Sequence, residues 1–354
     1  MDLKQVYKDK NVVISGHSGF KGSWLAFTLN WLGANVFGFS IDVPKNKKHA
    51  YFALDIPNLV NKNSIITDSV CESSYQNFLS NTKPDFIFHL AAQAIVKESL
   101  INPYKTIETN VLGVLNLLEY LRNEALSIPT VIVTSDKCYK NLNTSSPYIE
   151  TDELSGDDPY SASKAAAEIV FKAYQNSFFK ESDKPVSTVR AGNVFGGGDW
   201  SNSRLIPDCV SQILSAKEIS LRMPTATRPW TLVHDVLHGY LILGARLLQS
   251  PAKFSGSWNF ASGEEMTVEN VARILISKFD SYCGNIDLKF IGNTFQEHSQ
   301  LQIDATKAHS ELGWICRESL EKSLSKTAEW YIKQDSGVNM QSYSEHLLET
   351  FFST

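Results

Sequence analysis

Residues able to do acid–base chemistry follow an apolar run near the middle of the chain. The segment TSDKCY places Ser135, Asp136 and Lys137 directly after the run PTVIV. An apolar, β-branched run bounded by polar groups is typical of a buried strand. The polar groups after it could be a hydrogen-bonded turn, or the acid and base of a catalytic site. Taken alone, this segment leaves both interpretations open.

A tyrosine and a lysine four residues apart form a second candidate pair. Tyr160 and Lys164 stand in YSASK, and on a helix this spacing puts both on one face. A nearby ammonium group favours the phenolate, so we expect Lys164 to lower the pKa of Tyr160 and make it a general base. Such a pair is otherwise more often a surface contact. A catalytic role for this pair becomes more plausible with Ser135 at an expected strand end 25 residues earlier.

A glycine-rich turn near the N-terminus predicts a dinucleotide site. The segment NVVISGHSGFKGSWLAFTL contains an expected strand, a turn with Gly16, Gly19 and Gly22, and an expected helix. Glycines at this spacing allow a tight turn and admit a pyrophosphate to the backbone, and the helix N-terminus supplies N–H groups for the phosphates. Asp42 ends the next strand 20 residues after Gly22, where a carboxylate would bind a ribose hydroxyl. The alternative is a purely structural glycine turn.

The residues around Asp42 bear on which cofactor is bound. A carboxylate there would repel a 2′-phosphate, which favours NAD over NADP. Lys45, Lys47 and Lys48 follow closely and could reverse this preference. Asp68 comes after another expected strand in IITDS and could accept a hydrogen bond from the adenine amino group, or it could only end that strand in a turn.

Short apolar runs alternate with amphipathic stretches over the first part of the chain. We expect strands at 11–16, 34–42, 85–92, 129–135 and 186–194, and helices at 20–33, 74–82, 103–124 and 159–180. This alternation predicts an α/β fold, a doubly wound parallel sheet of the Rossmann type.

The pattern loosens after about residue 195 into loops rich in Gly, Pro and Trp. Short strands are expected at 219–224, 257–262 and 286–292, and helices near 235–249, 267–280 and 317–333. We therefore predict an NAD-binding Rossmann domain over 1–194 and a smaller irregular substrate lobe over 195–335, some segments of which return to the first domain. The C-terminal tail over 336–354 has no strong pattern.

Composition narrows the class of partner. With 354 residues, 43% of them hydrophobic, and a net charge of −5 from interspersed charges, the chain has no basic stripe for nucleic acid or membrane. No signal peptide and no apolar run of ~18 residues are present, which predicts a cytoplasmic protein with a small-molecule partner. Five scattered cysteines predict reduced thiols and no metal site. His89 and His234 each stand alone at a strand end, so we expect structural roles for them.

Taken together, these motifs resemble the extended short-chain dehydrogenase/reductase superfamily. The resemblance rests on the glycine turn, HLAAQ, Asn110, Ser135 and YSASK. Within the superfamily, GHSGFKGSWL, TSDKCY, DPYSASKAAAE, RAGNVFGGGDW, RLIPD and RPW are similar to the CDP-glucose 4,6-dehydratases, over about residues 11–335. Asp136-Lys137 also fits that branch, because related dTDP-glucose dehydratases carry Asp-Glu there.

The resemblance implies further binding residues. For the cofactor NAD these are Ser18, Phe20, Ala91, Ala92, Gln93 and Asn110, together with Tyr160 and Lys164. For the pyrophosphate and ribose of a nucleotide sugar, a CDP-hexose being favoured, they are Asn193, Arg204 and Arg228. Arg190 could instead form a buried ion pair. The resemblance also implies a homodimer, or a dimer of dimers, through the helices near 103–124 and 159–180.

The implied reaction is a 4,6-dehydration in deoxysugar biosynthesis for surface polysaccharide. Tyr160 would take the C4 hydroxyl proton as NAD takes the hydride, Lys137 or a neighbour would remove the C5 proton, and Asp136 would protonate the departing C6 hydroxyl. The hydride would then return to C6. Lys137 could instead only hold Asp136. Two rival functions remain open, a 4-epimerase or reductase, which would not need Asp136-Lys137, and a non-catalytic NAD-binding scaffold.

Overall fold

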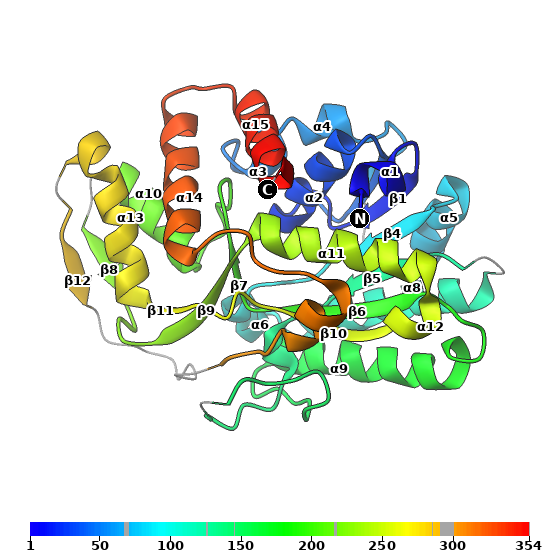
Figure 1. Cartoon of the computed structure of the whole chain (residues 1–354). Coiled ribbons are helices and arrows are strands. Elements are labelled where there is room, and N and C mark those ends of the chain that lie inside the picture. Colours follow the sequence, from blue (N-terminus) through cyan, green and yellow to red (C-terminus); the bar gives the residue numbers. More distant parts are fainter. Residues whose placement is uncertain are drawn as a thin grey trace.

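A seven-stranded parallel sheet forms the centre of the molecule (Figure 1). This computed structural model describes residues 1–66, 71–124, 127–144, 146–215, 218–284, 286–290 and 301–353. All neighbouring strand pairs of the sheet are parallel. In spatial order the strands are β10 (Gly256–Phe260), β6 (Val186–Ala191), β5 (Thr130–Val133), β4 (Phe86–His89), β1 (Asn11–Ser15), β2 (Asn35–Ser40) and β3 (Ile65–Ile66).

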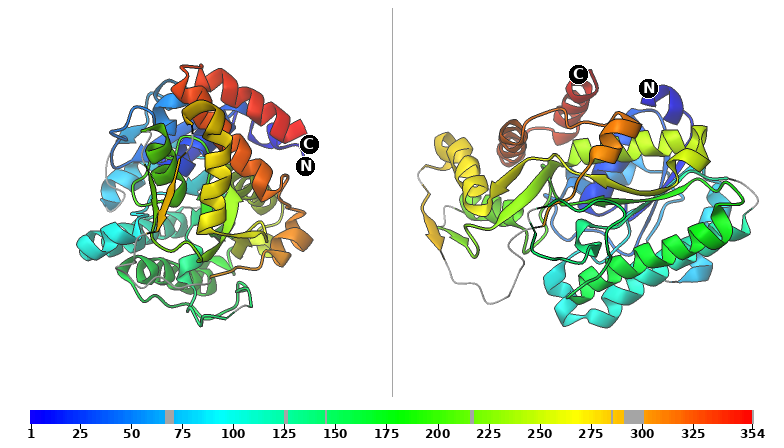
Figure 2. Two further views of the ribbon diagram at one scale, coloured as in Figure 1. Left: turned by 90° about the vertical axis from the view of Figure 1, so that its left-hand side faces the viewer. Right: turned by 60° about the horizontal axis from the view of Figure 1, so that its bottom comes forward.

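Helices cover both faces of this sheet (Figures 1 and 2). One face carries α1 (Leu3–Tyr7), α2 (Phe20–Trp31) and α11 (Val233–Gln249), and the other carries α5 (Glu72–Thr82), α8 (Gly113–Asn123) and α9 (Pro159–Tyr174). Side chains alternate between the two layers along each strand. In β4, Phe86 and Phe88 belong to the core on the α11 side, and Ile87 belongs to the core on the α8 side. The predicted doubly wound fold is thus confirmed.

The strand order changes direction beside β1. The chain runs from β1 outward to β2 and β3, then crosses back to place β4 on the other side of β1. Ser15 and His89, the last residues of β1 and β4, pair in register, so the loops that follow both strands leave the sheet together. In open α/β sheets this switch point is where ligands bind.

A smaller assembly extends from the carboxyl edge of the sheet, at the left of Figure 1. It contains a three-stranded sheet and a two-stranded sheet with two helices. Its elements are β7 (Asn193–Phe195), α10 (Leu205–Leu214), β8 (Ile219–Leu221), β9 (Thr227–Leu232), β11 (Glu265–Thr267), α13 (Val268–Cys283) and β12 (Leu288–Phe290). Two elements that come between these in the sequence belong to the main domain: β10 is a strand of the seven-stranded sheet, and α11 packs on one face of it.

The C-terminal segment differs from the sequence expectation. Helix α14 (Leu320–Asp335) is followed by α15 (Met340–Ser353), where no element was expected. The buried residues of α15, Met340, Ser344, Leu348 and Phe351, recur at helical spacing, so the signal is present but weakened by polar residues between them. The remaining short helices are α3 (Ala50–Ala53), α4 (Ile56–Leu59), α6 (Val96–Ile101), α7 (Pro103–Ile107) and α12 (Pro251–Phe254). Among the described residues, no helix has the length and apolar character that crossing a membrane requires.

Candidate active site

The glycine turn after β1 leaves the N-terminus of α2 open to a ligand. Gly16 has a φ of 78°, a backbone conformation that favours glycine. A Cβ on Gly22 would lie 2.0 Å from the Gly16 carbonyl oxygen, so only glycine lets the helix start this close to the turn. Gly19 is the N-cap of α2, and the only described atom within 4 Å of a Cβ on it is the Gly16 oxygen, at 3.4 Å. A pyrophosphate can therefore approach the backbone at the positive end of this helix.

The loop after β4 meets the glycine turn. A Cβ on Gly16 would lie 2.8 Å from the Ala91 nitrogen, which itself donates to Ser15 Oγ at 3.3 Å. Ala91 and Ala92 are half-buried at this junction. The two loops thus form the floor of the crevice at the switch point.

Asn110 fixes this loop against α9. Its side chain accepts from the Gln93 N–H at 2.8 Å and donates to the Gln93 carbonyl at 3.0 Å. The same amide donates to Ser163 Oγ at 2.8 Å. Because these contacts engage both ends of the buried Asn110 amide, its contribution to a cofactor site is to hold Gln93 and the loop in place.

Ser18 connects the glycine turn to the end of β2. Its N–H donates to Ser40 Oγ at 3.1 Å, and its hydroxyl donates to the Asp42 carbonyl at 2.6 Å. The Asp42 side chain is exposed just beyond β2, where a ribose carboxylate partner is expected. His17, which the sequence analysis did not single out, lies buried beside Ser40, its Nδ1 2.9 Å from Ser40 Oγ. Burial lowers the pKa of His17 to about 4, so this ring is neutral at physiological pH.

Two other predicted cofactor residues are placed differently. The Phe20 side chain is buried, and its ring lies 3.4 Å from a Cβ built on Gly196, in the loop after β7. Its backbone stands at the glycine turn, because Phe20 is the first residue of α2. Asp68 lies outside the described residues.

Ser135, Asp136 and Lys137 form the turn that ends β5. Asp136–Cys138 is a single 3-10 turn, and Ser135 caps it by accepting from the Lys137 N–H at 3.2 Å. The Ser135 hydroxyl also donates to Asp136 Oδ1 at 2.8 Å. Ser135 and Asp136 are only 7% and 6% exposed, whereas Lys137 is half-buried. The segment is thus a strand-ending turn that also presents an acid and a base to the crevice.

Tyr160 and Lys164 lie on one face of α9, as the spacing predicts. Asp158 caps this helix by accepting from the Tyr160 N–H at 2.9 Å. The Lys164 ammonium donates to the Val133 carbonyl, two residues before Ser135, at 3.2 Å. Both side chains of the pair are buried, at 7% and 5% exposed. The helix and the end of β5 therefore bring Ser135, Tyr160 and Lys164 together.

The expected lowering of the Tyr160 pKa is not found. Burial raises the pKa of Tyr160 to about 12, although a hydrogen bond with Ser135 opposes this change. Burial also lowers the pKa of Lys164 to about 8, which the Glu168 carboxylate partly offsets. The prediction is wrong for the chain alone, because removing both groups from water outweighs the effect of pairing them on one helix face.

Asp136 is suited to hold a proton. Burial raises its pKa above the ordinary value for an aspartate, while the charges of Lys137 and Arg228 and a hydrogen bond from Ser135 oppose this increase. Gly192 makes room for this carboxyl group, because a Cβ there would lie 3.3 Å from Asp136 Oδ2. A buried carboxyl with a raised pKa is the form that serves as a general acid.

Asp136 and Lys137 line a pocket with about 540 Å³ of space, part of it open to solvent. Asn193 and Arg228, two of the predicted substrate residues, line the same pocket. The residues around it also include Tyr139, Asn141, Gly156, Asp157, Asp158, Ser161 and Leu301. The structure thus brings the predicted acid and base together with two of the three predicted substrate residues.

The third predicted substrate residue, Arg204, does not line this pocket. Its guanidinium forms an ion pair with Asp199 at 3.1 Å, with a third of the Arg204 side chain exposed. Its charge nevertheless acts on Tyr160 and on Lys21, so it lies near the predicted catalytic residues.

Lys21, which the sequence analysis did not single out, lies near several of the predicted site residues. It is the second residue of α2, and its pKa is lowered to about 7 by burial and by the charges of Lys164 and Arg204, which Asp136 opposes. A lysine in the first turn of a helix opposes the helix dipole. That unfavourable position inside the glycine motif is the signal that could have identified it.

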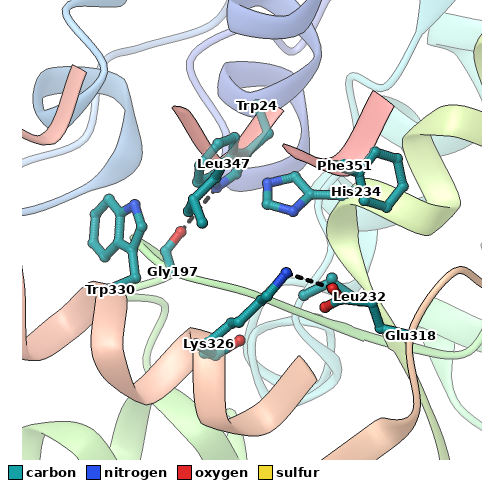
Figure 3. A pocket seen from close by; sticks show the side chains of 10 residues that line it. Trp24, Gly197, Leu232, His234, Glu318, Lys326, Trp330, Leu347 and Phe351 are labelled. Carbon is teal, nitrogen blue, oxygen red and sulfur yellow. Dashed lines mark hydrogen bonds and ion pairs between the residues drawn. The ribbon is translucent and has the colours of Figure 1, made fainter. Parts of the chain in front are cut away.

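A smaller cavity lies outside this site, beneath α14 and α15 (Figure 3). Trp24 donates to the Gly197 carbonyl at 2.8 Å there, and the His234 ring packs edge-on against Trp24 at 4.6 Å. His89 is buried elsewhere, with Nδ1 2.8 Å from Ser15 Oγ. His89 thus has a hydrogen-bonded structural position, as expected, whereas His234 packs against aromatic rings and its buried Nε2 has no hydrogen-bond partner among the described residues.

Comparison with known proteins gives related enzymes along the whole chain. The family model described as GDP-mannose 4,6 dehydratase matches residues 13–327. CDP-glucose 4,6-dehydratase of Salmonella typhimurium is 34% identical over 99% of this chain and 98% of its own. A dTDP-glucose 4,6-dehydratase of Haemophilus influenzae is 24% identical over 92% of this chain and 99% of its own.

Solved structures share the fold. The dTDP-glucose 4,6-dehydratase from Streptomyces venezuelae, solved with NAD bound, has a TM-score of 0.77 at 22% identity and covers 92% of this chain and 98% of its own. UDP-glucose 4-epimerase from Thermotoga maritima, solved with UDP-glucose, has a TM-score of 0.76 at 22% identity and covers 91% of this chain and 99% of its own. Dehydratases and epimerases therefore share this architecture, and the fold alone does not separate them.

Proposed function

The chain belongs to the GDP-mannose 4,6-dehydratase family, and from this we propose that it converts CDP-glucose to CDP-4-keto-6-deoxyglucose with NAD as its bound cofactor. The observation that carries this proposal is the position of Asp136 and Lys137. They stand one and two residues beyond Ser135, which contacts Tyr160, and they line the same pocket as Arg228. An epimerase needs only the tyrosine and its partner Ser135, whereas a dehydratase also needs an acid and a base such as Asp136 and Lys137.

The crevice fits a dinucleotide. The open side of Gly19 and the N-terminus of α2 would hold the pyrophosphate, and the exposed Asp42 carboxylate would hold the adenosine ribose. Lys47 lies 3.9 Å over the Phe52 ring, and Lys48 is paired with Asp335 at 2.8 Å. Both ammonium groups have partners other than a 2′-phosphate, which supports NAD over NADP. When bound, NAD accepts a hydride from sugar C4 and later returns it to C6.

Oxidation at C4 is assigned to the buried end of the site. Tyr160 takes the C4 hydroxyl proton, and Ser135 orients the phenol through the hydrogen bond between them. A phenol with a raised pKa is a strong base once it is ionised. The Lys164 ammonium, held by the Val133 carbonyl, adds positive charge on the same helix face.

Elimination across C5 and C6 is assigned to the turn after β5. The free-amine form of Lys137 takes the C5 proton, which the C4 ketone makes acidic, and Asp136 donates its proton to the C6 hydroxyl so that water leaves. The raised pKa of Asp136 keeps that proton available. The two side chains follow each other on one 3-10 turn, which supports their acting on two bonded carbons, C5 of the ring and the exocyclic C6.

The nucleotide end of the substrate is assigned to Asn193, Arg228 and Arg204. Asn193 and Arg228 line the pocket that Asp136 enters, and a guanidinium can bind two phosphate oxygens at once. Arg204 is aligned by its ion pair with Asp199. The cytidine base is proposed from the 34% identity to the Salmonella typhimurium enzyme. We assign this binding to the 195–335 lobe and the cofactor to residues 1–194.

A homodimer is part of the proposal. Apolar side chains are exposed on α6, α7 and α9, as well as on the helical turn before α8; the largest are Leu100, Ile101, Tyr104, Ile107, Leu112 and Ile169. Tyr104 and Ile101 are 77% and 65% exposed. Exposed apolar residues on adjacent helices favour packing against a second copy of the same helices. With a charged nucleotide sugar as substrate, we place the enzyme in the cytoplasm and its product in deoxysugar synthesis for lipopolysaccharide.

The proposal is tested by incubating the protein with CDP-, dTDP-, UDP- and GDP-glucose and measuring product masses. We expect loss of one water from CDP-glucose. In deuterated water, the product should carry deuterium at C5 and the original C4 hydrogen at C6. An isomer of unchanged mass would indicate a 4-epimerase, and bound NAD without any product would indicate a non-catalytic scaffold.

A further inference from the structure

A buried ion pair lies behind the turn that carries Asp136 and Lys137. The Arg190 guanidinium on β6 is 2.7 Å from the Glu168 carboxylate on α9, and the two side chains are 3% and 1% exposed. Replacing such pairs by apolar residues is often neutral or stabilising in proteins, so stability alone is a weak reason for this one. The hydrogen bonds that connect this ion pair to the turn indicate a role in positioning the turn.

Glu168 holds the residue that precedes the turn. Thr134, the neighbour of Ser135, donates its hydroxyl to Glu168 Oε1 at 2.5 Å. The second carboxylate oxygen accepts from Thr188 at 2.9 Å and from Ser257 at 3.1 Å. Donors from the end of β5, from β6 and from β10 therefore hold this α9 carboxylate in one position, and the start of the turn is tied to it.

Arg190 holds the residue that follows the turn. Its NH1 donates to the Tyr139 hydroxyl at 2.8 Å, and the guanidinium lies 4.8 Å from the centre of the Tyr139 ring. The Tyr139 hydroxyl in turn donates to Asn259 Oδ1 at 2.8 Å. Tyr139 is the C-cap of the 3-10 turn, so the end of the turn is tied to the same ion pair as its start.

We propose that the Arg190–Glu168 pair is a positioning device that clamps both ends of the Ser135–Cys138 turn and so keeps Asp136 and Lys137 in register with the sugar during elimination. This inference rests on the proposed dehydratase function. Misplacing a catalytic group by about 1 Å can cost about 10²-fold in rate, so contacts that fix both ends of this turn can affect the rate of elimination. Arg190 and Glu168 themselves act through Thr134 and Tyr139, so they are positioning residues.

The Tyr139 hydroxyl is the cleanest point at which to open the clamp. Glu168 also acts on the charge of Lys164, so a change there would disturb the oxidation half as well. Tyr139→Phe keeps the ring against Arg190 and removes only the hydrogen bonds at the far end of the turn. Tyr7→Phe is the matched control, because it removes a fully buried hydroxyl that donates to the Leu241 carbonyl at 2.8 Å, away from the site.

The experiment follows reduced cofactor by absorbance in a single turnover of CDP-glucose, and product by mass. For Tyr139→Phe we expect the elimination rate to fall about tenfold and the rate of cofactor reduction to fall by much less, so that reduced cofactor accumulates. Tyr7→Phe should match the wild type in both steps. A merely structural role for the clamp would lower the unfolding temperature and leave the ratio of the two rates unchanged.

Two results would overturn the inference. One is a Tyr139→Phe enzyme whose two rates match those of Tyr7→Phe, and the other is an equal loss in both steps. A wild-type protein that dehydrates none of the nucleotide sugars would overturn the proposed function, and this inference with it.

Discussion

The two ends of the site differ in how they are built. Ser135, Tyr160 and Lys164 come from one strand end and one helix, and all three side chains are at least nine-tenths buried. The other end joins the turn at Asp136 to Asn193 and Arg228 from the smaller assembly, around a pocket that is partly open. At the buried end, Tyr160 and Lys164 are held at a fixed spacing on one helix, and burial shifts the pKa values of both. Such burial suits a hydride transfer, which has to be protected from water. The open end has to admit a sugar, so its geometry depends on several distant segments.

Adjacent residues of one turn mark the border between these two ends. Ser135 contacts the tyrosine, and Asp136 faces the pocket. If the two ends serve separate half-reactions, substitutions on either side of this border should affect different steps.

Tyr160→Phe should have the largest effect. The substitution removes the proposed base and leaves the ring in its buried position. We expect formation of reduced cofactor to fall about 10³-fold, because general base catalysis contributes on that scale. Absorbance of the reduced cofactor after mixing with CDP-glucose measures this step. Reduction at the wild-type rate would show that another group takes the C4 proton.

Asp136→Asn should have the next largest effect, on the other step. Asparagine keeps an oxygen to accept the Ser135 hydroxyl but has no acidic proton for the C6 hydroxyl. We expect elimination to slow about 10²-fold while reduced cofactor still forms and accumulates. Product mass and cofactor absorbance in the same single turnover separate the two rates. Equal losses in both steps would remove the distinction between the two ends.

The sequence predicted the buried end well, because its geometry is local. The four-residue spacing of Tyr160 and Lys164 determines that they share a helix face, and the apolar run before Ser135 determines where its strand ends. The glycine motif likewise predicted the open turn at Gly19, since the required backbone conformation is encoded in a few adjacent residues. Such local patterns have the same meaning in any fold in which the helix, strand or turn forms.

Properties that depend on distant segments were not predictable. The pKa of Tyr160 was predicted in the wrong direction because it is set by burial, which arises only when α9 packs against the end of β5. The buried ion pair that the sequence allowed for Arg190 is confirmed, but its partner Glu168 could not be named in advance, because the pair requires β6 and α9 to be adjacent. Lys21 reaches the site only because α2 starts at the switch point. Each of these is decided by the assembled sheet rather than by spacing along the chain.

The pH dependence should separate the two steps with a smaller effect. In elimination Asp136 donates a proton and Lys137 accepts one, so a pH change that favours one of them disfavours the other, and elimination varies less with pH than oxidation. Tyr160, with a pKa of about 12, is a better source of phenolate at higher pH, so oxidation accelerates until Lys164 loses its charge near its pKa of about 8. Transient reduced cofactor should therefore rise up to about tenfold between about pH 6 and pH 8. A fall over this range would reverse the assigned acid and base.

Gly192→Ala should have the smallest and most local effect. A Cβ at this position would lie 3.3 Å from Asp136 Oδ2 and 3.0 Å from the Pro229 side chain, so the carboxyl must shift by a few tenths of an ångström. Because a displacement of about 1 Å costs about 10²-fold, we expect elimination to slow only about threefold. Tyr160 and Lys164 are not among the atoms that the new methyl group would meet, so the rate of cofactor reduction in the same turnover serves as the internal control. If cofactor reduction slows and elimination does not, Gly192 acts on the buried end, and the border between the two ends does not lie between Ser135 and Asp136.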